Sequence, residues 1–352
     1  MKGSSPSEFE IAGEVGIEAF CKGASFFATG GGGSYARACA IFRELIRARS
    51  LPPLVRLEAL GPSEICVSAF GVGATSASSD ACVAINNAAA ALTGVLGTKI
   101  AGVVPVEIGP LSLASAYYAA SLLKVPVIDA DIVGGRASPE VFLETISLFD
   151  MHRTPAAIAN AEGDTAILLS SKSGDSEEKF FRGFASIESG EAYVVGYPFS
   201  VKRLSETISL HTVSRCLQAG RLLMEGSSEQ LVESYRGRRL FRGKVSKIEE
   251  TESAGFLSLL VSISDEESRV GKIFVKNEYL ILWVDARVVC SCPELICILD
   301  QNGSPVPSGE IKLDMVVEVI GLPSEKIWHS ERGLRLFSPR TFGFDFDAVL
   351  LK

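Results

Sequence analysis

The sequence predicts an α/β N-terminal domain with a mostly parallel sheet, followed by a β-rich (α+β) C-terminal domain. The first half alternates apolar, β-prone runs with helical patterns, which is typical of strands joined by helical crossovers. Beyond about residue 165 the apolar runs become short and strand-like, and helical patterns become rare. The chain of 352 residues has the length of about two domains. We therefore predict domains at residues 8–167 and 168–352.

The predicted elements of the first half follow one another as βαβ units. Ser34 is expected to cap a helix that follows a run of glycines. In "EICVSAFGVGATSASSD" a buried-type strand runs into a Gly/Ser-rich loop, and an alanine-rich helix follows near residues 80–94. The strands "IAGVVPVEIG" and "VPVIDAD" follow, with a helix between them. Ser138 as N-cap and Pro139 at the first helical position predict one more helix in "SPEVFLETISLF".

The second half predicts strands separated by acidic or Gly/Pro-rich turns. One amphipathic helix is expected in "LHTVSRCLQAGRLLMEG". The strand-like runs are "TAILLS", "EAYVVGYPFS", "RLFRGKVSKIEE", "FLSLLVSISD", "KIFVKNEYLILWV" and "VVEVIGLP".

Charge and composition exclude several classes of protein. The net charge is −8, and no stretch concentrates enough basic residues to follow a phosphate backbone, so we expect no nucleic-acid partner. No apolar run is long enough to span a membrane, and the first residues lack a signal-peptide core, so a cytoplasmic protein is expected.

The eight cysteines lie mostly in apolar runs, as buried reduced thiols do. The spacing in "CSCPELIC" lacks the paired C-x2-C of zinc modules.

The stretch "TGGGGSY" is the first candidate binding element. Glycines that enter a helix expose backbone N–H groups at the positive end of the helix dipole, where an anion or a polarised carbonyl binds. Thr29 and Gly31, Gly32 and Gly33 are the candidate ligand contacts, and the alternative is a tight turn without a ligand. A G-x-G-x-x-G frame from Gly30 meets a tyrosine where glycine is required, so no nucleotide cofactor is expected.

Acidic residues at predicted strand ends form the second candidate. Ligands of open parallel sheets bind beyond the carboxyl ends of the strands, and Glu107, Asp129 and Asp131 are predicted to lie there as catalytic groups. Neighbouring carboxylates raise one another's pKa, so such a cluster can hold a proton for acid/base work or bind a divalent cation. Arg136 and Glu140 follow closely enough to join this site. Taken singly, each acid could instead cap a turn or a helix.

Several motifs are spread over nearly the whole chain. They are "ATGGGGSY", "VVPVEIG", "VPVIDADIVGGRASPE", "RRLFRGKV", "KNEYL", "CPELICILD" and "GLPSEKIW…GLRLFSPRTFGFD". Together they resemble the S-methyl thiohydantoin desulfurase family, formerly a domain of unknown function associated with hydantoinase and oxoprolinase subunits. The resemblance implies the same two domains. It also implies cleavage of the exocyclic C–S bond of an S-methyl thiohydantoin, or of a related cyclic amide, with release of methanethiol.

The resemblance also implies further substrate contacts and shows departures. Its hydroxyl positions match Ser200, Thr212 and Ser214, and its Asn-Glu-Asn-Leu segment matches Asn277 and Glu278. The departures are Ala28 for a glycine, Ser147 for a histidine, His211 for a glycine and Tyr279 for the second asparagine of that segment.

Three functional classes remain open from the sequence. The first is a hydrolase of a thiohydantoin or related cyclic amide, in which one carboxylate activates water and another acid protonates the ring or the leaving sulfur. The second is a non-catalytic partner or ligand-binding subunit of a hydantoinase-type enzyme. The third, a dinucleotide-dependent oxidoreductase, is weakened by the broken glycine frame. A homo-oligomer is expected, and the metal, if the site uses one, is not identified.

Overall fold

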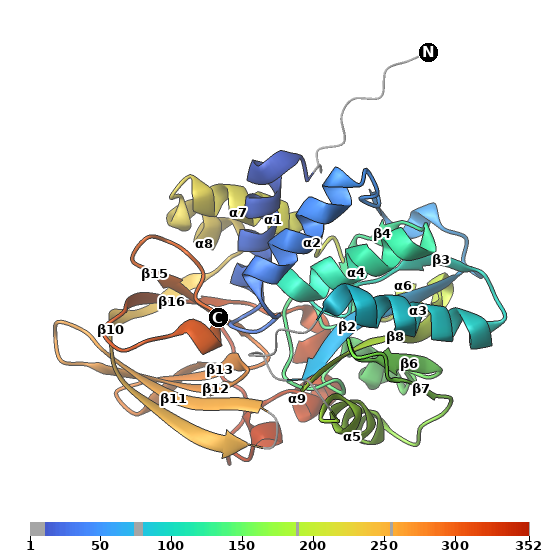
Figure 1. Cartoon of the computed structure of the whole chain (residues 1–352). Helices are drawn as coiled ribbons and strands as arrows, with labels where there is room; N and C mark the ends of the chain where they lie inside the picture. The colour runs from blue at the N-terminus through green and yellow to red at the C-terminus, as the bar shows by residue number, and fades with distance from the viewer. Residues whose placement is uncertain (1–10, 74–79, 188–189, 254–255, 352) are drawn as a thin grey trace.

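A computed structural model of the chain describes residues 11–73, 80–187, 190–253 and 256–351. It shows an α/β domain beside a β-rich domain (Figure 1), which confirms the predicted fold class. Residues 74–79, where the strand is predicted to run into a Gly/Ser-rich loop, lie outside the described residues. Within them, no helix is both long and apolar enough to cross a membrane.

The first sheet has the strand order β1-β4-β3-β2-β8-β6-β7 in the described part of the chain. Strands β1, β4, β3 and β2 run parallel to their neighbours, and β8, β6 and β7 continue the sheet antiparallel. The sheet therefore takes one strand, β8, from beyond residue 168. The strands are β1 (Leu54–Val55), β2 (Ile65–Gly73), β3 (Ile100–Val103), β4 (Val127–Ile128), β6 (Ala156–Ala159), β7 (Thr165–Leu168) and β8 (Glu191–Ser200).

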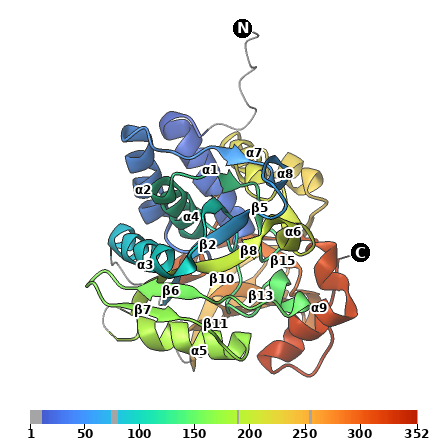
Figure 2. The ribbon, with the colours of Figure 1, turned by 90° about the vertical axis from the view of Figure 1, so that its right-hand side faces the viewer.

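Alternate residues of the first sheet face two separate apolar cores, as the period of two along a strand requires. In β2, Val67 and Ala69 pack toward one group of helices, and Cys66 and Phe70 toward the other. The first group is α1 (Gly13–Phe27), α2 (Tyr35–Arg47), α3 (Ala81–Leu96) and α4 (Pro110–Leu123), and the second is α5 (Gly174–Ala185) and α6 (Val201–Ser205) (Figure 2).

The second sheet is antiparallel throughout, with the order β14-β13-β12-β11-β10-β16-β15. One face carries a core that includes Val261, Ile273, Leu282 and Val319. The strands are β10 (Arg238–Ser253), β11 (Phe256–Ser264), β12 (Val270–Lys276), β13 (Glu278–Val284), β14 (Arg287–Ser291), β15 (Leu295–Asp300) and β16 (Val316–Leu322).

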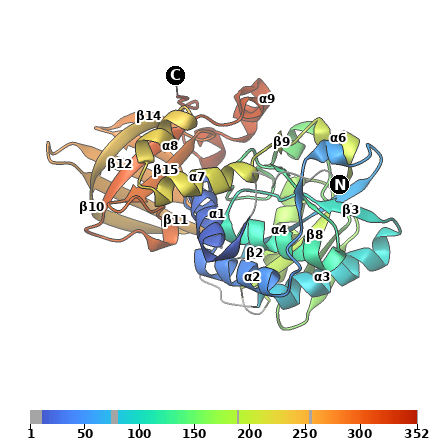
Figure 3. The same cartoon turned by 90° about the horizontal axis from the view of Figure 1, so that it is seen from above.

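Two helices connect the sheets (Figure 3). Helix α7 (Ser214–Met224), the amphipathic helix that the sequence predicts, packs along α1 and is followed by α8 (Ser228–Ser234). Glycines permit this close contact, because a Cβ at Gly23 would lie 1.8 Å from the Cys216 carbonyl oxygen and one at Gly220 would lie 1.6 Å from that of Ala19.

Short elements complete the fold, and the C-terminal ones return to the first domain. Trp328 is fully buried, and its Nε1–H donates to the Val133 carbonyl at 2.7 Å. This contact ties the end of the chain to the segment that follows Asp131. The remaining elements are the pair β5 (Ala130–Asp131) and β9 (Ser209–Leu210), helix α9 (Glu331–Leu336), and the 3₁₀ helices η1 (Leu57–Ala59), η2 (Thr145–Phe149), η3 (Ser308–Glu310), η4 (Lys326–His329) and η5 (Pro339–Phe342).

The sequence predicts two helices that begin at a serine N-cap, and one of them is confirmed. Ser34 caps α2 as expected, since its side chain accepts the Arg37 N–H. The helix predicted after Ser138 is wrong: only residues 145–149 form a short 3₁₀ helix. Side chains bind the backbone there in place of helical partners, because the N–H groups of Ser138 and Val141 donate to glutamate carboxylates.

Candidate active site

A cavity of about 130 Å³ lies where the two domains meet. It is much smaller than the roughly 300–1,000 Å³ of a drug-sized ligand site, so it suits a small ring. The α/β domain contributes most of the wall, and the β-rich domain contributes the start of β13. The lining residues are 31–34, 70–73, 106–107, 111–112, 133, 138–141, 144, 277 and 278, together with Arg37, Arg182 and Glu191.

The glycine run forms one wall because its backbone touches other segments directly. A Cβ at Gly31 would lie 1.8 Å from Glu278 Oε1, and one at Gly32 would lie 2.4 Å from the Gly109 Cα. Gly32 also has φ +74°, a conformation that side chains disfavour. The loop presents the N-terminus of α2 to the cavity, where backbone N–H groups favour negative charge. The four glycines thus serve both packing and exposure of the backbone.

Glu278 is the most unusual group in the cavity. Glu278 is 3% exposed, and its Oε2 is buried without a hydrogen-bond partner among the described residues. Burial, and then the negative charge of Glu107, raise its pKa well above the ordinary value, while Arg136 and Arg182 oppose that shift. A glutamic acid that stays protonated and faces a cavity is equipped to donate a proton.

Glu107 lines the same cavity in a different environment. Its Oε1 accepts the Ser112 hydroxyl at 2.6 Å, and its Oε2 accepts the Ser138 N–H at 3.0 Å. Burial raises its pKa, and these two bonds together with Arg136 counteract the shift. Because hydrogen bonds to a carboxylate favour the charged form, Glu107 is better suited than Glu278 to carry the negative charge.

Two arginines bring positive charge to the cavity wall. Arg37 of α2 donates to both carboxylate oxygens of Glu191, at 2.8 and 2.9 Å, and to the Tyr193 hydroxyl at 3.0 Å. Arg182 of α5 pairs with Glu178 and donates to the Pro139 carbonyl at 3.0 Å. Both guanidinium groups are fixed by these bonds, so the wall is pre-formed.

Comparison with known proteins identifies the family. The family model described as "S-Me-THD-like, N-terminal domain" matches residues 15–170, and the model described as "S-Me-THD-like, C-terminal domain" matches residues 172–351. The chain belongs to the S-Me-THD-like family. No curated protein matches it. An X-ray structure of a protein from Chromobacterium violaceum is similar over 96% of this chain and 98% of its own, with a TM-score of 0.77 and 21% identity, which shows a shared fold.

In this S-Me-THD-like chain, the cavity gathers about half of the residues that the sequence singles out. Those that line it are Gly31, Gly32, Gly33, Glu107, Glu140, Asn277 and Glu278. Those that are not among its lining residues are Thr29, Asp129, Asp131, Arg136, Ser200, Thr212 and Ser214.

Asp129 and Asp131 bind backbone rather than face the cavity. Asp129 Oδ1 accepts the N–H groups of Val213 and Ser214, at 3.1 and 2.8 Å, at the start of α7, and its Oδ2 accepts the Ser214 hydroxyl at 2.7 Å. Asp131 is fully buried and accepts three successive N–H groups, those of residues 133–135, at 2.7–2.9 Å. Burial raises the pKa of Asp131 to about 7 against these bonds. The geometry thus gives both aspartates a local structural task.

Arg136 and Thr29 join the two domains beside the cavity. The guanidinium of Arg136 is fully buried and donates to the Glu294 carbonyl at 3.0 Å and to the Pro293 carbonyl. It lies 4.7 Å from the centre of the Phe337 ring. The Thr29 carbonyl accepts the Tyr279 N–H at 2.7 Å. These contacts hold β13, and therefore Glu278, against the glycine loop.

The remaining hydroxyl residues act locally. Ser200 caps α6 by accepting the Arg203 N–H at 3.4 Å. Thr212 is buried and bonds Asp131, and Ser214 bonds Asp129. His211 has φ +62°, the left-handed region in which glycine is favoured, and its exposed ring lies 3.4 Å from Asp129 Oδ2.

Sequence reasoning missed several cavity residues. Arg37 follows the N-cap by one turn, but helical periodicity assigns it to the solvent face. Ser112 follows Glu107 by five residues and is brought to it by the Gly109–Pro110 start of α4. Arg182, Glu144 and Glu191 carry no local signal, since they come from separate elements. Among the described residues, no group of three or more His, Cys, Asp or Glu side chains is placed to hold a metal ion.

Proposed function

We propose that this protein is a hydrolase that cleaves the C–S bond of an S-methyl thiohydantoin or a related cyclic amide. The observation that carries the proposal is the pair Glu278 and Glu107, two carboxyl groups that face one small cavity in contrasting environments. Such a contrast separates the roles of acid and base at one pH. The family to which the chain belongs supports the thiohydantoin class of substrate.

The first step is addition of water to the ring carbon that bears sulfur. Glu107 takes one proton from the water as its oxygen bonds to that carbon. The electrons of the C=N bond move to the ring nitrogen, which takes the proton of Glu278. Each proton transfer of this kind contributes about 10²- to 10⁴-fold to the rate.

The second step restores both carboxyl groups. The tetrahedral adduct re-forms a carbonyl, its hydroxyl proton passes to Glu278, and the C–S bond breaks as the sulfur takes the proton from Glu107. Water and the S-methyl thiohydantoin are consumed, and the hydantoin and methanethiol are released. Backbone N–H groups at the N-terminus of α2 lie on the same wall and stabilise negative charge that develops on the ring.

The test is turnover of S-methyl thiohydantoins in water labelled with oxygen-18. Methanethiol is measured with a thiol reagent, and the hydantoin is measured by mass spectrometry. We expect equal amounts of both products and one labelled oxygen in the hydantoin. Release of thiol without label would contradict direct attack of water.

Failure to release thiol has a defined meaning as well. If the purified chain does not turn over these compounds but copurifies with a hydantoinase-like protein, the partner-subunit hypothesis replaces the hydrolase. Binding of the thiohydantoin without turnover would support a ligand-binding subunit in the same way.

A further inference from the structure

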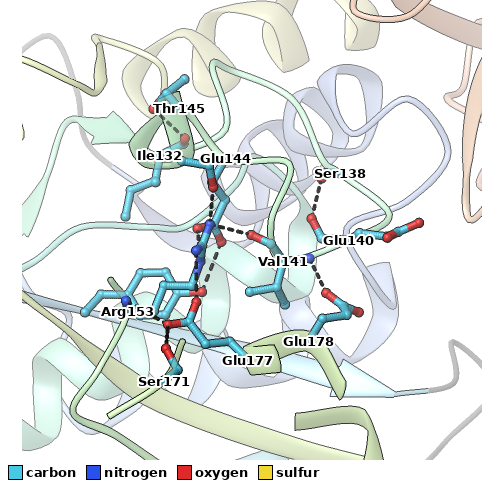
Figure 4. A network of polar contacts seen from close by, with 12 residues as sticks. Ile132, Ser138, Glu140, Val141, Glu144, Thr145, Arg153, Ser171, Glu177 and Glu178 are labelled. Atoms are coloured by element: carbon cyan, nitrogen blue, oxygen red, sulfur yellow. Dashed lines mark hydrogen bonds and ion pairs between the residues drawn. The ribbon is translucent and has the colours of Figure 1, made fainter. Parts of the chain in front are cut away.

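The segment of residues 138–144, which we call the cavity loop, lines the cavity without regular secondary structure. Such a loop needs other groups to fix its backbone. Figure 4 shows that several of these groups gather around one arginine. The arginine is Arg153, which is 2% exposed and directly precedes the residue pair that leads into β6.

Arg153 binds the cavity loop and the residues that follow it through its guanidinium nitrogens. Its Nη2 donates to the Val141 carbonyl at 2.9 Å and to the Ser147 hydroxyl at 2.6 Å. Its Nε donates to Glu144 Oε2 at 2.7 Å. Three points of the segment are therefore held by one planar group, a pattern that suits arginine and that a lysine ammonium cannot reproduce.

Helix α5 holds the arginine from the other side. Arg153 Nη1 donates to Glu177 Oε2 at 3.0 Å, and both groups are buried. A Cβ at Gly174 would lie 3.1 Å from Arg153 Nη1 and 2.9 Å from the Phe142 Cβ, so the start of α5 approaches closely only because it is a glycine. Figure 4 shows Arg153 between Glu144 and Glu177. This arrangement locks the position of the guanidinium group.

The positive charge of Arg153 is balanced by buried glutamates that it contacts. Glu144 and Glu177 contact it directly, and the Tyr197 hydroxyl donates to Glu144 Oε1 at 3.1 Å. Burial raises the pKa of Glu144 to about 7, while Arg153 opposes that shift. A buried guanidinium with two buried carboxylates is costly to break, because loss of one partner leaves a charge without compensation.

The cavity loop in turn holds Glu107. Its first N–H, that of Ser138, donates to Glu107 Oε2 at 3.0 Å. The Ser138 hydroxyl donates to the Glu140 carbonyl at 2.9 Å, so the N–H and the loop move together. The charged groups that act on Glu107 from other elements are Arg136 and, across the cavity, Glu278. Displacement of the loop therefore weakens one of the bonds that keep Glu107 ionised.

We propose that Arg153 is a positioning residue that fixes the cavity loop and, through the Ser138 N–H, the carboxylate of Glu107. The loop part of this inference is independent of the reaction, and the effect on turnover rests on the proposed function. Arg153 is not among the residues that line the cavity, so its action is indirect.

The test compares Arg153→Lys with Arg335→Lys, the same substitution at an exposed arginine that pairs with Glu331. Hydrogen exchange measured by mass spectrometry reports on peptides that cover residues 138–149. We expect at least tenfold faster exchange there in Arg153→Lys and no change in Arg335→Lys. In turnover, kcat should fall about 10- to 100-fold with a smaller change in KM, since a small displacement of a catalytic group has that effect.

The pH profile separates positioning from a general loss of stability. The Ser138 N–H lowers the pKa of Glu107. Weakening that bond should move the acidic limb of the kcat profile to higher pH in Arg153→Lys, whereas partial unfolding would scale the whole profile. Unchanged exchange at residues 138–149 in a folded Arg153→Lys protein would overturn the proposal, whatever the turnover.

A second variant keeps the proposal testable if Arg153→Lys does not fold. Ser147→Ala removes one of the three points at which Arg153 holds the segment and leaves the ion pairs intact. We expect faster exchange in the same peptides, about two- to fivefold, and a smaller shift of the acidic limb. If Arg153→Lys is unfolded and Ser147→Ala exchanges these amides at the wild-type rate, the proposed positioning of the loop is contradicted. If the wild type does not turn over thiohydantoins, the exchange data still decide the positioning claim.

Discussion

Glu278 and the aspartate pair are all buried acids, yet their surroundings differ in one respect. Each oxygen of Asp129 and Asp131 accepts at least one N–H or O–H bond. In contrast, Glu278 keeps one buried oxygen without a partner among the described residues and faces a cavity. A carboxylate whose oxygens are bonded away from the cavity stabilises the fold, whereas one with a free oxygen at the cavity is available to a ligand.

This difference has a physical basis in the cost of burial. Burying a carboxyl group without hydrogen bonds costs free energy, so a protein retains it where another benefit exists. Glu278 is brought into that position by Gly31, which leaves room for its side chain. Hydrogen-bond saturation therefore separates Glu278 from the two aspartates, whereas Glu107, whose oxygens also accept two bonds, differs from them by lining the cavity.

The largest expected effect is loss of turnover in Glu278→Gln. The amide keeps the volume of the side chain but cannot donate an acidic proton, so kcat should fall about 10²- to 10⁴-fold. Glu107→Gln should cause a loss of the same size through the missing base. Thiol release measures both, and circular dichroism controls for folding. Wild-type rates in either variant would remove that glutamate from the mechanism.

Gly31→Ala tests the contact that shapes the site. Its Cβ would lie 1.8 Å from Glu278 Oε1, so the glutamate must move, and we expect at least tenfold lower kcat with reduced thermal stability. Gly94→Ala is the matched control: it lies in α3 with no atom within 4 Å of the new Cβ. That change should stabilise the protein by about 0.5–1 kcal/mol and leave turnover unaltered. Equal behaviour of the two variants would contradict the role assigned to Gly31.

Asp129→Ala tests the other side of the comparison. Removal of a group that caps a helix costs about 0.5–2 kcal/mol, and α7 loses the acceptor for two of its first N–H groups. Urea unfolding should show this loss, while turnover per folded molecule stays within about twofold. The hypothesis from sequence, in which Asp129 is catalytic, requires instead a loss of about 10²- to 10⁴-fold. Turnover measured without urea, on fully folded protein, decides between the structural and the catalytic role of Asp129.

The pH dependence of stability gives an effect that is small near pH 4.5 and grows as the pH rises. A glutamate in the unfolded chain loses its proton near pH 4.5, whereas folded Glu278 keeps it to higher pH. Folding therefore takes up a proton above about pH 4.5, and the stability of the wild type falls as pH rises toward the folded pKa. Glu278→Gln should become progressively more stable than the wild type over that range, by up to about 1.4 kcal/mol per pH unit. A constant difference from pH 4 to pH 8 would show that the buried carboxyl does not titrate as described.

Most of the fold could be read from the sequence, and the site only in part. Periodicity located the α/β half, β10, β11, β16 and α7, because burial of one face imposes its period on the chain. It predicted β12 and β13 as one run and did not single out β14 and β15. The segment after Ser138 defeated local reasoning, since its backbone bonds go to Glu107, Glu178, Arg153 and Arg182 instead of to its own turns. Propensity cannot anticipate partners that arrive from other elements.

The sequence by itself determined that a glycine loop, a strand-end glutamate and a polar pair within a late apolar strand run would be present. Only the tertiary structure decided which acids share a cavity. Glu107 and Glu278 are 171 positions apart, and they line one cavity because the Tyr279 N–H of β13 bonds the Thr29 carbonyl beside the glycine loop. Asp129 and Asp131 lie nearer to Glu107 in sequence, yet their oxygens are taken up by nearby backbone N–H groups. The pairing of charges depends on distances in space and on hydrogen-bond partners, and neither is encoded in local spacing.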